Sequence, residues 1–290
     1  MVQDLTFLDE MVTDSTAEVR SAPYSSRQDV PLVSKLTALS RLLPYLLITG
    51  LCLPVQVLLH RVSSPVVWER FCRWYHARAV TALGVKIIEV GIQSKAKPTL
   101  FVSNHNSYFD IEVLGAKILG TFVAMADVAD WPLFGLLSKL QDTVFIDRKV
   151  GTIAEQQRQI TKRFDRKQNL IIFPEGSSYT GTHTLPFKSS LLAVAKHEVE
   201  QQPVTIQPVS VTFAKLDGLP IARSLRSYYG WYGHSPIVPH ITGAAGLGKL
   251  TMVVEWHPPK TIKDFAGNRK KLAAYCEDSI LAGMARARST

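Results

Sequence analysis

Apolar residues change their spacing along the chain, and the change divides the chain into parts. Between residues 42 and 59 they form a nearly unbroken run in which only Thr49 and Gln56 are clearly polar. From Pro65 to Leu83 they recur at helical spacing, with arginines between them. From Val85 onward, short apolar runs alternate with helical segments. This order predicts N-terminal helices followed by an α/β domain.

The alternation after Val85 predicts an α/β fold with a central, mostly parallel mixed sheet flanked by helices and preceded by membrane-associated helices. Residues 214–249 are rich in Gly, Tyr and Pro, and we expect a long loop or insertion there. We divide the chain into an acidic, flexible tail (1–30), a membrane-associated helical segment (31–83) and the α/β domain (84–290). The expected strands are 85–90, 98–103, 121–126, 142–147, 169–173, 204–213 and 250–256, and the expected helices are 110–118, 131–140, 151–167, 188–200 and 264–286.

The apolar run 42–59 is nearly long enough to cross a membrane. Its 18 residues would extend about 27 Å as a helix, against a hydrocarbon core of about 30 Å. Pro44 and Pro54 would kink such a helix. Basic residues on both flanks favour a helix or hairpin that dips into the cytoplasmic leaflet over one clean span. The alternative is a buried core helix of a soluble protein. The flanking bases are Lys35, Arg41, His60 and Arg61.

Charge is distributed unevenly. The chain has 33 Lys and Arg and 24 Asp and Glu, a net charge of +9. The first 30 residues carry a net charge of −4, so the rest carries +13. A basic body indicates an anionic partner, either nucleic acid or an anionic membrane surface, or else only a solvated basic surface. The bases are scattered and no recognition module is present, which argues against nucleic acid.

A histidine and an aspartate stand where an expected strand passes into a helix. His105 follows the strand 98–103, and Asp110 falls in the first turn of the next helix. The carboxylate can hold one ring nitrogen and fix the tautomer, which leaves the other nitrogen as a general base. The alternative is an aspartate that caps the helix beside a structural histidine.

Two more polar clusters follow expected strands. Glu175, Gly176 and Ser177 come after the strand 169–173; glycine permits close backbone approach, and the other two side chains offer groups that hydrogen-bond a polar ligand. Arg148 comes after the strand 142–147, and its guanidinium suits a phosphate. Loops after strand carboxyl ends converge on one crevice of an α/β sheet, so we expect the clusters to form one site.

With these residues in order, the chain resembles the glycerolipid acyltransferases typified by 1-acyl-glycerol-3-phosphate (lysophosphatidic acid) acyltransferases. The resemblance covers about Val85 to Phe213. A later Gly-Trp-Tyr-Gly segment, 230–233, resembles a bacterial branch that includes lyso-ornithine lipid acyltransferases. Many members have Arg at the position of Ser178; Lys188 resembles a basic position of the family and is expected to compensate. The motifs are Asn104-His-Asn-Ser-Tyr-Phe-Asp110, Phe145-Ile-Asp-Arg148, Phe173-Pro-Glu-Gly-Ser177 and Val204-Thr-Ile-Gln-Pro-Val-Ser-Val211.

The resemblance implies transfer of a fatty acyl group from an acyl thioester, acyl-CoA or acyl carrier protein, to the hydroxyl of a lysolipid. The first expected acceptor is 1-acyl-glycerol-3-phosphate, which would give phosphatidic acid, and the alternative is lyso-ornithine lipid. His105, oriented by Asp110, would be the general base. No metal or cofactor is required, and the expected location is the inner membrane with the site facing the cytoplasm. A thioesterase-like hydrolase and a non-enzymatic membrane adaptor are the other hypotheses. The expected substrate-binding residues are Asn104, Ser107, Arg148, Glu175, Gly176, Ser177 and Lys188.

Overall fold

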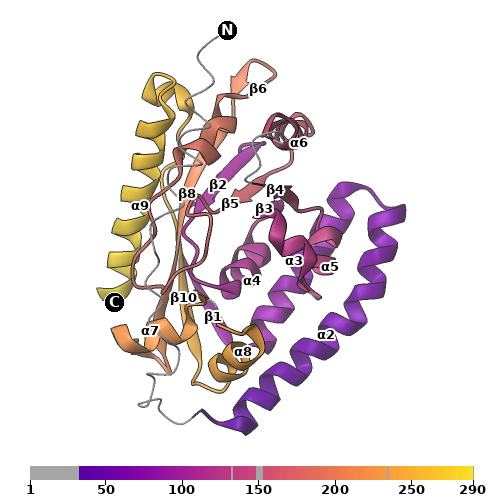
Figure 1. The fold of residues 1–290 in the computed structure, drawn as a ribbon, viewed down its shortest axis with the longest axis vertical. Coiled ribbons are helices and arrows are strands. Elements are labelled where there is room, and N and C mark those ends of the chain that lie inside the picture. Colours follow the sequence, from indigo (N-terminus) through magenta and orange to yellow (C-terminus); the bar gives the residue numbers. More distant parts are fainter. Residues whose placement is uncertain (1–32, 132, 148–152, 234, 290) are drawn as a thin grey trace.

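The computed structural model describes residues 33–131, 133–147, 153–233 and 235–289. A mixed sheet with the order β1-β10-β8-β2-β5-β3-β4 runs through their centre, and β9 pairs with β8 at one end (Figure 1). Neighbours on the main path pair in parallel except β8 and β10. The predicted fold class is therefore confirmed. The strands are β1 (Val85–Gly91), β2 (Thr99–Ser103), β3 (Thr121–Met125), β4 (Val144–Ile146), β5 (Leu170–Ile172), β6 (Glu198–Val199), β7 (Gln202–Pro203), β8 (Thr205–Leu216), β9 (Leu219–Pro220) and β10 (Leu250–Trp256).

Helices cover both faces of the sheet (Figure 1). The expectation of a loop over 214–249 is wrong, because α7 and α8 lie there. Both helices are short, so the glycine and proline residues at their ends made the whole segment look like a loop. The expected helix 188–200 is a 3₁₀ helix, η5, followed by β6. The expected tail 1–30 lies outside the described residues. The helices are α2 (Lys35–Val62), α3 (Pro65–Ala82), α4 (Tyr108–Lys117), α5 (Phe134–Leu140), α6 (Ile153–Asp165), α7 (Arg223–Tyr229), α8 (Ile237–Ala245), α9 (Arg269–Ser289), and the 3₁₀ helices η3 (Ala126–Asp130), η5 (Ser189–Lys196) and η6 (Ile262–Phe265).

The central strands are apolar on both faces, and alternate residues enter two different cores. On β2, Phe101 joins a core shared with α3 and α4, whereas Leu100 and Val102 join one shared with α6 and α9. All three side chains are fully buried. Continuous apolar runs are expected for strands covered on both sides. This double cover holds the carboxyl ends of β2 and β5 rigidly side by side, where the candidate site lies.

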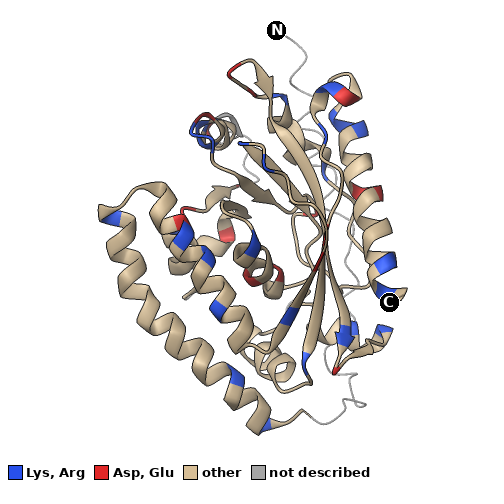
Figure 2. Ribbon diagram, turned by 180° about the vertical axis from the view of Figure 1, so that it is seen from behind, with Lys and Arg blue, Asp and Glu red and all other residues tan. Residues whose placement is uncertain are grey.

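The helix α2 exposes its large apolar side chains, the reverse of what a helix on the surface of a soluble protein does. Its buried residues form a narrow stripe of small or polar-tipped side chains, whereas leucines point outward, with Leu36 80% and Leu51 73% exposed. Figure 2 shows almost no charge along its length. Its 28 residues extend about 42 Å, and by length and composition it is the one helix of the described chain able to cross a membrane. A core helix would hide its leucines, so that alternative is not supported. The buried residues are Ala38, Tyr45, Thr49, Cys52 and Gln56.

The helix α3 packs on the domain in the manner of an ordinary amphipathic helix. It buries Tyr75, His76 and Ala79 against α2 and α4 and exposes arginines on its outer face. One flanking base of α2 also faces the protein, because Arg41 donates from Nη1 to three carbonyls at and just beyond the end of α8, those of Ala245, Leu247 and Gly248 at 2.7–3.0 Å. Positive charge is favourable at a helix C-terminus. The packing of α3 and the hydrogen bonds of Arg41 together fix the N-terminal helices to the α/β domain.

Candidate active site

A capping box sets the start of α4, directly after the loop that follows β2. Ser107 is the N-cap, and its Oγ accepts the backbone N–H of Phe109 at 3.2 Å. Asp110 accepts the backbone N–H of Ser107 on Oδ2 at 2.8 Å. These reciprocal bonds satisfy N–H groups that a helix start leaves free. Asp110 therefore helps to cap the helix from its third position, whereas the alternative from the sequence had placed the aspartate at the N-cap, which is Ser107.

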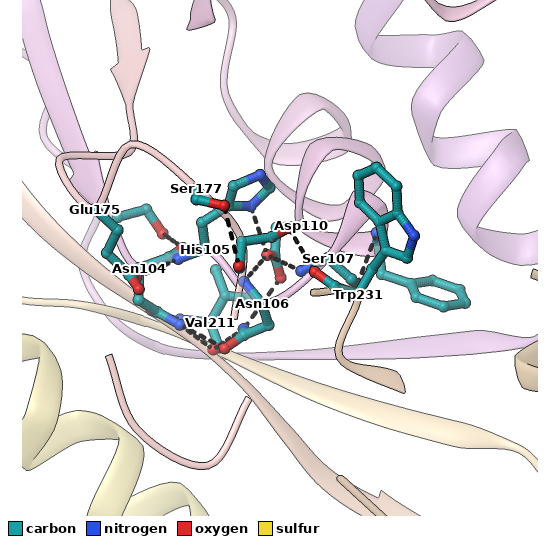
Figure 3. Close-up of polar contacts among 12 residues, drawn as sticks. Asn104, His105, Asn106, Ser107, Asp110, Glu175, Ser177, Val211 and Trp231 are labelled. Carbon is teal, nitrogen blue, oxygen red and sulfur yellow. Dashed lines mark hydrogen bonds and ion pairs between the residues drawn. The ribbon is translucent and has the colours of Figure 1, made fainter. Parts of the chain in front are cut away.

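The same carboxylate also holds His105. Oδ2 of Asp110 lies 3.1 Å from Nδ1 of His105 and accepts the backbone N–H of Asn106 at 2.5 Å (Figure 3). Asp110 is fully buried, whereas the His105 side chain is 20% exposed. Because a carboxylate only accepts, Nδ1 carries the proton and Nε2 has the free lone pair. The imidazole stacks on Phe173, with ring centroids 4.1 Å apart and planes at 17°. The pair thus has the geometry of an oriented general base.

Asn104 and Ser107 contact the protein rather than open space. The Asn104 amide pairs with the backbone of Val211 on β8, accepting its N–H at 2.8 Å and donating to its carbonyl at 2.9 Å. The second amide hydrogen goes to Oδ1 of Asn106 at 3.1 Å. Asn104 and Ser107 are both fully buried. The expected substrate contacts of these two residues are therefore replaced by structural ones, which anchor the loop to β8 and start α4.

Glu175 joins the two site loops. One carboxylate oxygen accepts the backbone N–H of His105 and the other that of Leu185, each at 2.7 Å. The side chain is only 3% exposed. The pKa of Glu175 is raised to about 8, mainly by burial and to a smaller extent by the nearby Asp110, against the lowering effect of the two N–H groups. We expected Glu175 to contact substrate, and both of its oxygens instead hold the backbone.

The loop after β5 brings a glycine and two serines to the site. Gly176 has φ +71°, a left-handed conformation that glycine adopts without strain. Nζ of Lys188 lies beside it, 3.5 Å from where a Cβ would stand. Gly176, Ser177 and Ser178 line the same cavity as His105. Oγ of Ser178 donates to the carbonyl of Trp231 at 2.5 Å, so this position ties two loops together.

A cavity of about 330 Å³ opens beside the His105 ring. Its walls come from β3, η3, α3, α4 and α5 and are mostly apolar, with Phe122, Phe134 and Leu137 among them. Trp231 lines it as well and packs edge-on against Trp131 at 5.1 Å. An apolar cavity with few polar groups at one point is the usual form of a site for a hydrophobic ligand.

Another part of the cavity wall is a buried polar cluster. Glu112 accepts from the Tyr45 hydroxyl at 3.0 Å and lies 2.7 Å from Nδ1 of His76. Gln141 hydrogen-bonds the other nitrogen of His76. Buried polar groups are tolerated when their hydrogen-bonding partners are all present, as here. The cluster joins α2, α3 and α4, and the sequence carried no local signal for it, since His76 and Glu112 are far apart in the chain.

The structure gathers His105, Asp110, Gly176 and Ser177 at one place, with Lys188 next to Gly176. Arg148 lies outside the described residues. Sequence reasoning missed Phe173 as the stacking partner of His105, and treated Trp231 only as part of a motif. Among the described residues, no cluster of three His, Cys, Asp or Glu side chains could hold a metal ion.

Comparison with known proteins places this arrangement in a family. A family model described as Acyltransferase matches residues 85–212. The chain is 30% identical over 235 residues to the lyso-ornithine lipid O-acyltransferase of Brucella abortus (strain 2308), over 79% of this chain and 87% of that protein. It is 34% identical over 209 residues to the lyso-ornithine lipid O-acyltransferase of Rhizobium meliloti (strain 1021), over 70% and 71%. The chain belongs to this acyltransferase family.

Two further proteins match this chain either over a shorter range or at a lower sequence identity. The 1-acyl-sn-glycerol-3-phosphate acyltransferase of Neisseria gonorrhoeae is 33% identical over 128 residues, 41% of this chain and 50% of that protein. The crystal structure of the 1-acyl-sn-glycerophosphate (LPA) acyltransferase PlsC from Thermotoga maritima has the same fold, with a TM-score of 0.64 at 19% identity, over 88% of this chain and 98% of that one. The family resemblance and the enzyme class predicted from the motifs are thus confirmed.

Proposed function

We propose that this acyltransferase moves a fatty acyl group from an acyl thioester, acyl-CoA or acyl carrier protein, to the free hydroxyl of a lysolipid, with His105 as the general base. The observation that carries the proposal is the ring of His105, held at Nδ1 by buried Asp110 and exposed at an apolar cavity that suits an acyl chain. A base must lie within reach of the proton it removes, with its tautomer fixed.

In the proposed reaction, Nε2 of His105 removes the proton of the lysolipid hydroxyl as that oxygen attacks the thioester carbonyl. A C–O bond forms, and the C–S bond then breaks. The leaving thiolate takes the proton back from the imidazolium. The buried carboxylate of Asp110 stabilises the imidazolium between these steps. The reaction needs neither metal nor cofactor, because proton transfer and acyl transfer balance between the two substrates.

The residues around this pair have two different tasks in the proposal. Glu175 holds the backbone of His105, so it positions the base through the loop. Gly176, Ser177 and Lys188 lie beside the cavity opening at His105, and we assign them to the acceptor headgroup. Arg148 keeps its predicted headgroup role as part of this proposal.

We infer that lyso-ornithine lipid is the acceptor, in preference to 1-acyl-glycerol-3-phosphate. Two relatives that are 30% and 34% identical over 79% and 70% of this chain are lyso-ornithine lipid O-acyltransferases, whereas the 1-acyl-sn-glycerol-3-phosphate acyltransferase of Neisseria gonorrhoeae matches 41% of it. In addition, Ser178 occupies the position where the resemblance leads one to expect an arginine, and its hydroxyl is engaged by Trp231. One cation fewer suits a zwitterionic headgroup better than a phosphate monoester. The glycerophosphate acceptor stays as the second candidate.

The exposed leucines of α2 support the proposal that the enzyme acts at a membrane, where a lysolipid acceptor would lie. We propose that the segment 31–83 attaches the chain to the inner membrane through the exposed face of α2 and that 84–290 is the catalytic domain on the cytoplasmic side. A large exposed apolar face usually marks a membrane or partner contact, and basic residues on both flanks prefer the cytoplasmic side.

The test is an assay of purified enzyme with each lysolipid and each thioester, comparing wild type with His105→Ala. We expect His105→Ala to lower transfer by about 10²–10⁴-fold. His197→Ala is a matched control, because Nε2 of His197 also pairs with a carboxylate, that of Asp165 at 2.7 Å, on the surface. Equal rates of acyl transfer by His105→Ala and wild type would refute the role of His105 as general base. Release of free fatty acid in the absence of a lysolipid would instead support the hypothesis of a thioesterase-like hydrolase.

A further inference from the structure

Three arginines, Arg223, Arg226 and Arg288, gather where α7 meets the C-terminal end of α9, and none of the described acidic side chains forms an ion pair with them. Arg288 donates from Nη2 to the carbonyl of Gly181 at 3.0 Å. Arg226 and Arg223 lie on α7, whose end packs on the same loop: a Cβ on Gly230 would stand 2.7 Å from the backbone carbon of Thr180. Within the ranges the structure describes, no carboxylate pairs with any of the three.

Two of these guanidinium groups are incompletely satisfied. Nε of Arg226 and Nε of Arg288 are both buried without a hydrogen-bond partner. Burial, with repulsion from the neighbouring arginines, lowers the pKa of Arg288 to about 10. Buried donors without acceptors and unpaired like charges are both unfavourable. An anion with several acceptor oxygens would relieve both costs at once, since a guanidinium binds phosphate oxygens through more than one N–H.

The cluster is connected to the candidate active site by one short loop. Ser177 lines the cavity beside His105, and Gly181 contacts Arg288. Four residue steps separate them, at most about 14 Å of chain. Midway along this loop, the N–H of Tyr179 donates to the carbonyl of His105 at 3.0 Å. The arginines do not line the cavity itself, but this short spacing is within the length of one extended molecule whose other end reacts at His105.

The position of the cluster argues against a lipid headgroup. Figure 1 shows α7 and the end of α9 at one side of the molecule, and the outer face of α2 at the other. Figure 2 shows basic residues gathered at this end of α9 and on α7. If α2 lies in the membrane, this basic patch faces water. A soluble anion is the partner that such a surface meets.

We propose that Arg223, Arg226 and Arg288 bind the phosphate of the 4′-phosphopantetheine arm of the acyl donor while its thioester lies at His105. This arm is common to coenzyme A and to acyl carrier protein, so the same arginines serve either source. The inference rests on the proposed acyl transfer and adds the place where the donor is held.

The test measures steady-state kinetics of Arg288→Ala and Arg226→Ala with acyl-CoA and, separately, with acyl carrier protein. We expect KM for the donor to rise about tenfold for each variant, since a charge-assisted hydrogen bond to phosphate is lost. The KM for the lysolipid and kcat should stay at wild-type values. A rise with every donor that the enzyme accepts supports the shared phosphate. A rise with only one of two accepted donors would contradict it, because the phosphate of the arm is present in both. Arg288→Lys, which keeps the charge, should recover part of the affinity.

Arg286→Ala is the matched control. Arg286 lies on the same helix two residues earlier, but it pairs with Glu255 at 2.6 Å, so its loss should leave donor KM unchanged. Titration of unacylated coenzyme A into wild type and Arg288→Ala separates this inference from the proposed function, because it needs no turnover. Wild-type donor KM and wild-type coenzyme A binding in both arginine variants would overturn the inference.

Discussion

The carboxylate of Glu175 accepts the backbone N–H of His105 at 2.7 Å, so the loop after β5 holds the loop after β2 at its proposed base. The second oxygen accepts the N–H of Leu185 at 2.7 Å. Glu175, which resembles a ligand-binding residue by sequence, thus connects two loops through hydrogen bonds to their backbones. Its effect on activity is expected to pass entirely through the position of the imidazole.

Glu175→Gln should weaken this hydrogen-bonded connection between the loops without unfolding the chain. The glutamine amide has one acceptor oxygen, and its NH₂ group would face one of the two backbone donors. An unsatisfied buried donor costs about 1–3 kcal/mol, and we expect activity to fall about tenfold. Glu277→Gln is the control, because Glu277 also accepts a backbone N–H, that of Phe187 at 3.3 Å. Full activity in Glu175→Gln, measured as acyl transfer, would contradict this role.

The raised pKa of Glu175 predicts how stability depends on pH. Its pKa is about 8 in the folded chain, well above the ordinary value of a glutamate in an unfolded chain, so between these two values the folded state binds more protons than the unfolded state. The free energy of unfolding therefore falls as pH rises through this range, by linkage. We expect the melting temperature of wild type to drop relative to that of Glu175→Gln between pH 5 and about 8. A constant difference across this range would show that Glu175 does not titrate there.

Gly176→Ala should affect both stability and activity. Alanine at φ +71° is strained by about 1–2 kcal/mol, and the change displaces a loop that lines the cavity. Gly218→Ala is a matched control: its φ is +85° and nothing lies within 4 Å of a Cβ there. Both variants should unfold at lower denaturant concentration, but only Gly176→Ala should raise KM for the lysolipid. Equal kinetics in the two variants would remove Gly176 from the acceptor site.

The buried cluster on Glu112 should contribute to how α2 and α3 pack on α4. Glu112→Ala leaves the donors of Tyr45 and His76 unpaired, and each unpaired buried donor costs about 1–3 kcal/mol. Tyr45→Phe removes one donor together with its bond and should cost less. The melting temperatures of both variants in detergent show which substitution destabilises the fold more. If Tyr45→Phe destabilises as much as Glu112→Ala, the carboxylate is not the centre of the cluster.

Charge on the outer face of α2 should impair membrane binding. Leu46 and Leu47 are 55% and 56% exposed, and Leu46→Glu with Leu47→Glu places two carboxylates where we propose lipid. We expect the double variant to shift from the membrane pellet toward the supernatant in cell fractionation. Leu219→Glu is the control, on a leucine 72% exposed at β9. An unchanged distribution would mean that this face does not enter the bilayer.

The sequence predicted the sheet well because Leu100, Phe101 and Val102 belong to a strand buried on both faces, whose apolar run has few other interpretations. It also predicted that His105 and Asp110 meet, since both lie within one strand-to-helix connection. It could not show that Asn104 binds Val211 rather than a ligand, because an asparagine after a strand has the same local pattern in either role. Nor could it pair His76 with Glu112, whose contact depends on how α3 packs on α4.

The capping box on α4 explains why four residues separate the proposed base from its carboxylate. Asp110 occupies the third position of the helix, and only there can it reach back to the N–H of Ser107 and to the ring of His105. One residue inserted in this interval would turn the carboxylate by about 100° around the helix axis. The start of the helix and the orientation of the proposed base thus depend on a single oxygen atom, so the length of this connection is set by backbone geometry as much as by the proposed chemistry.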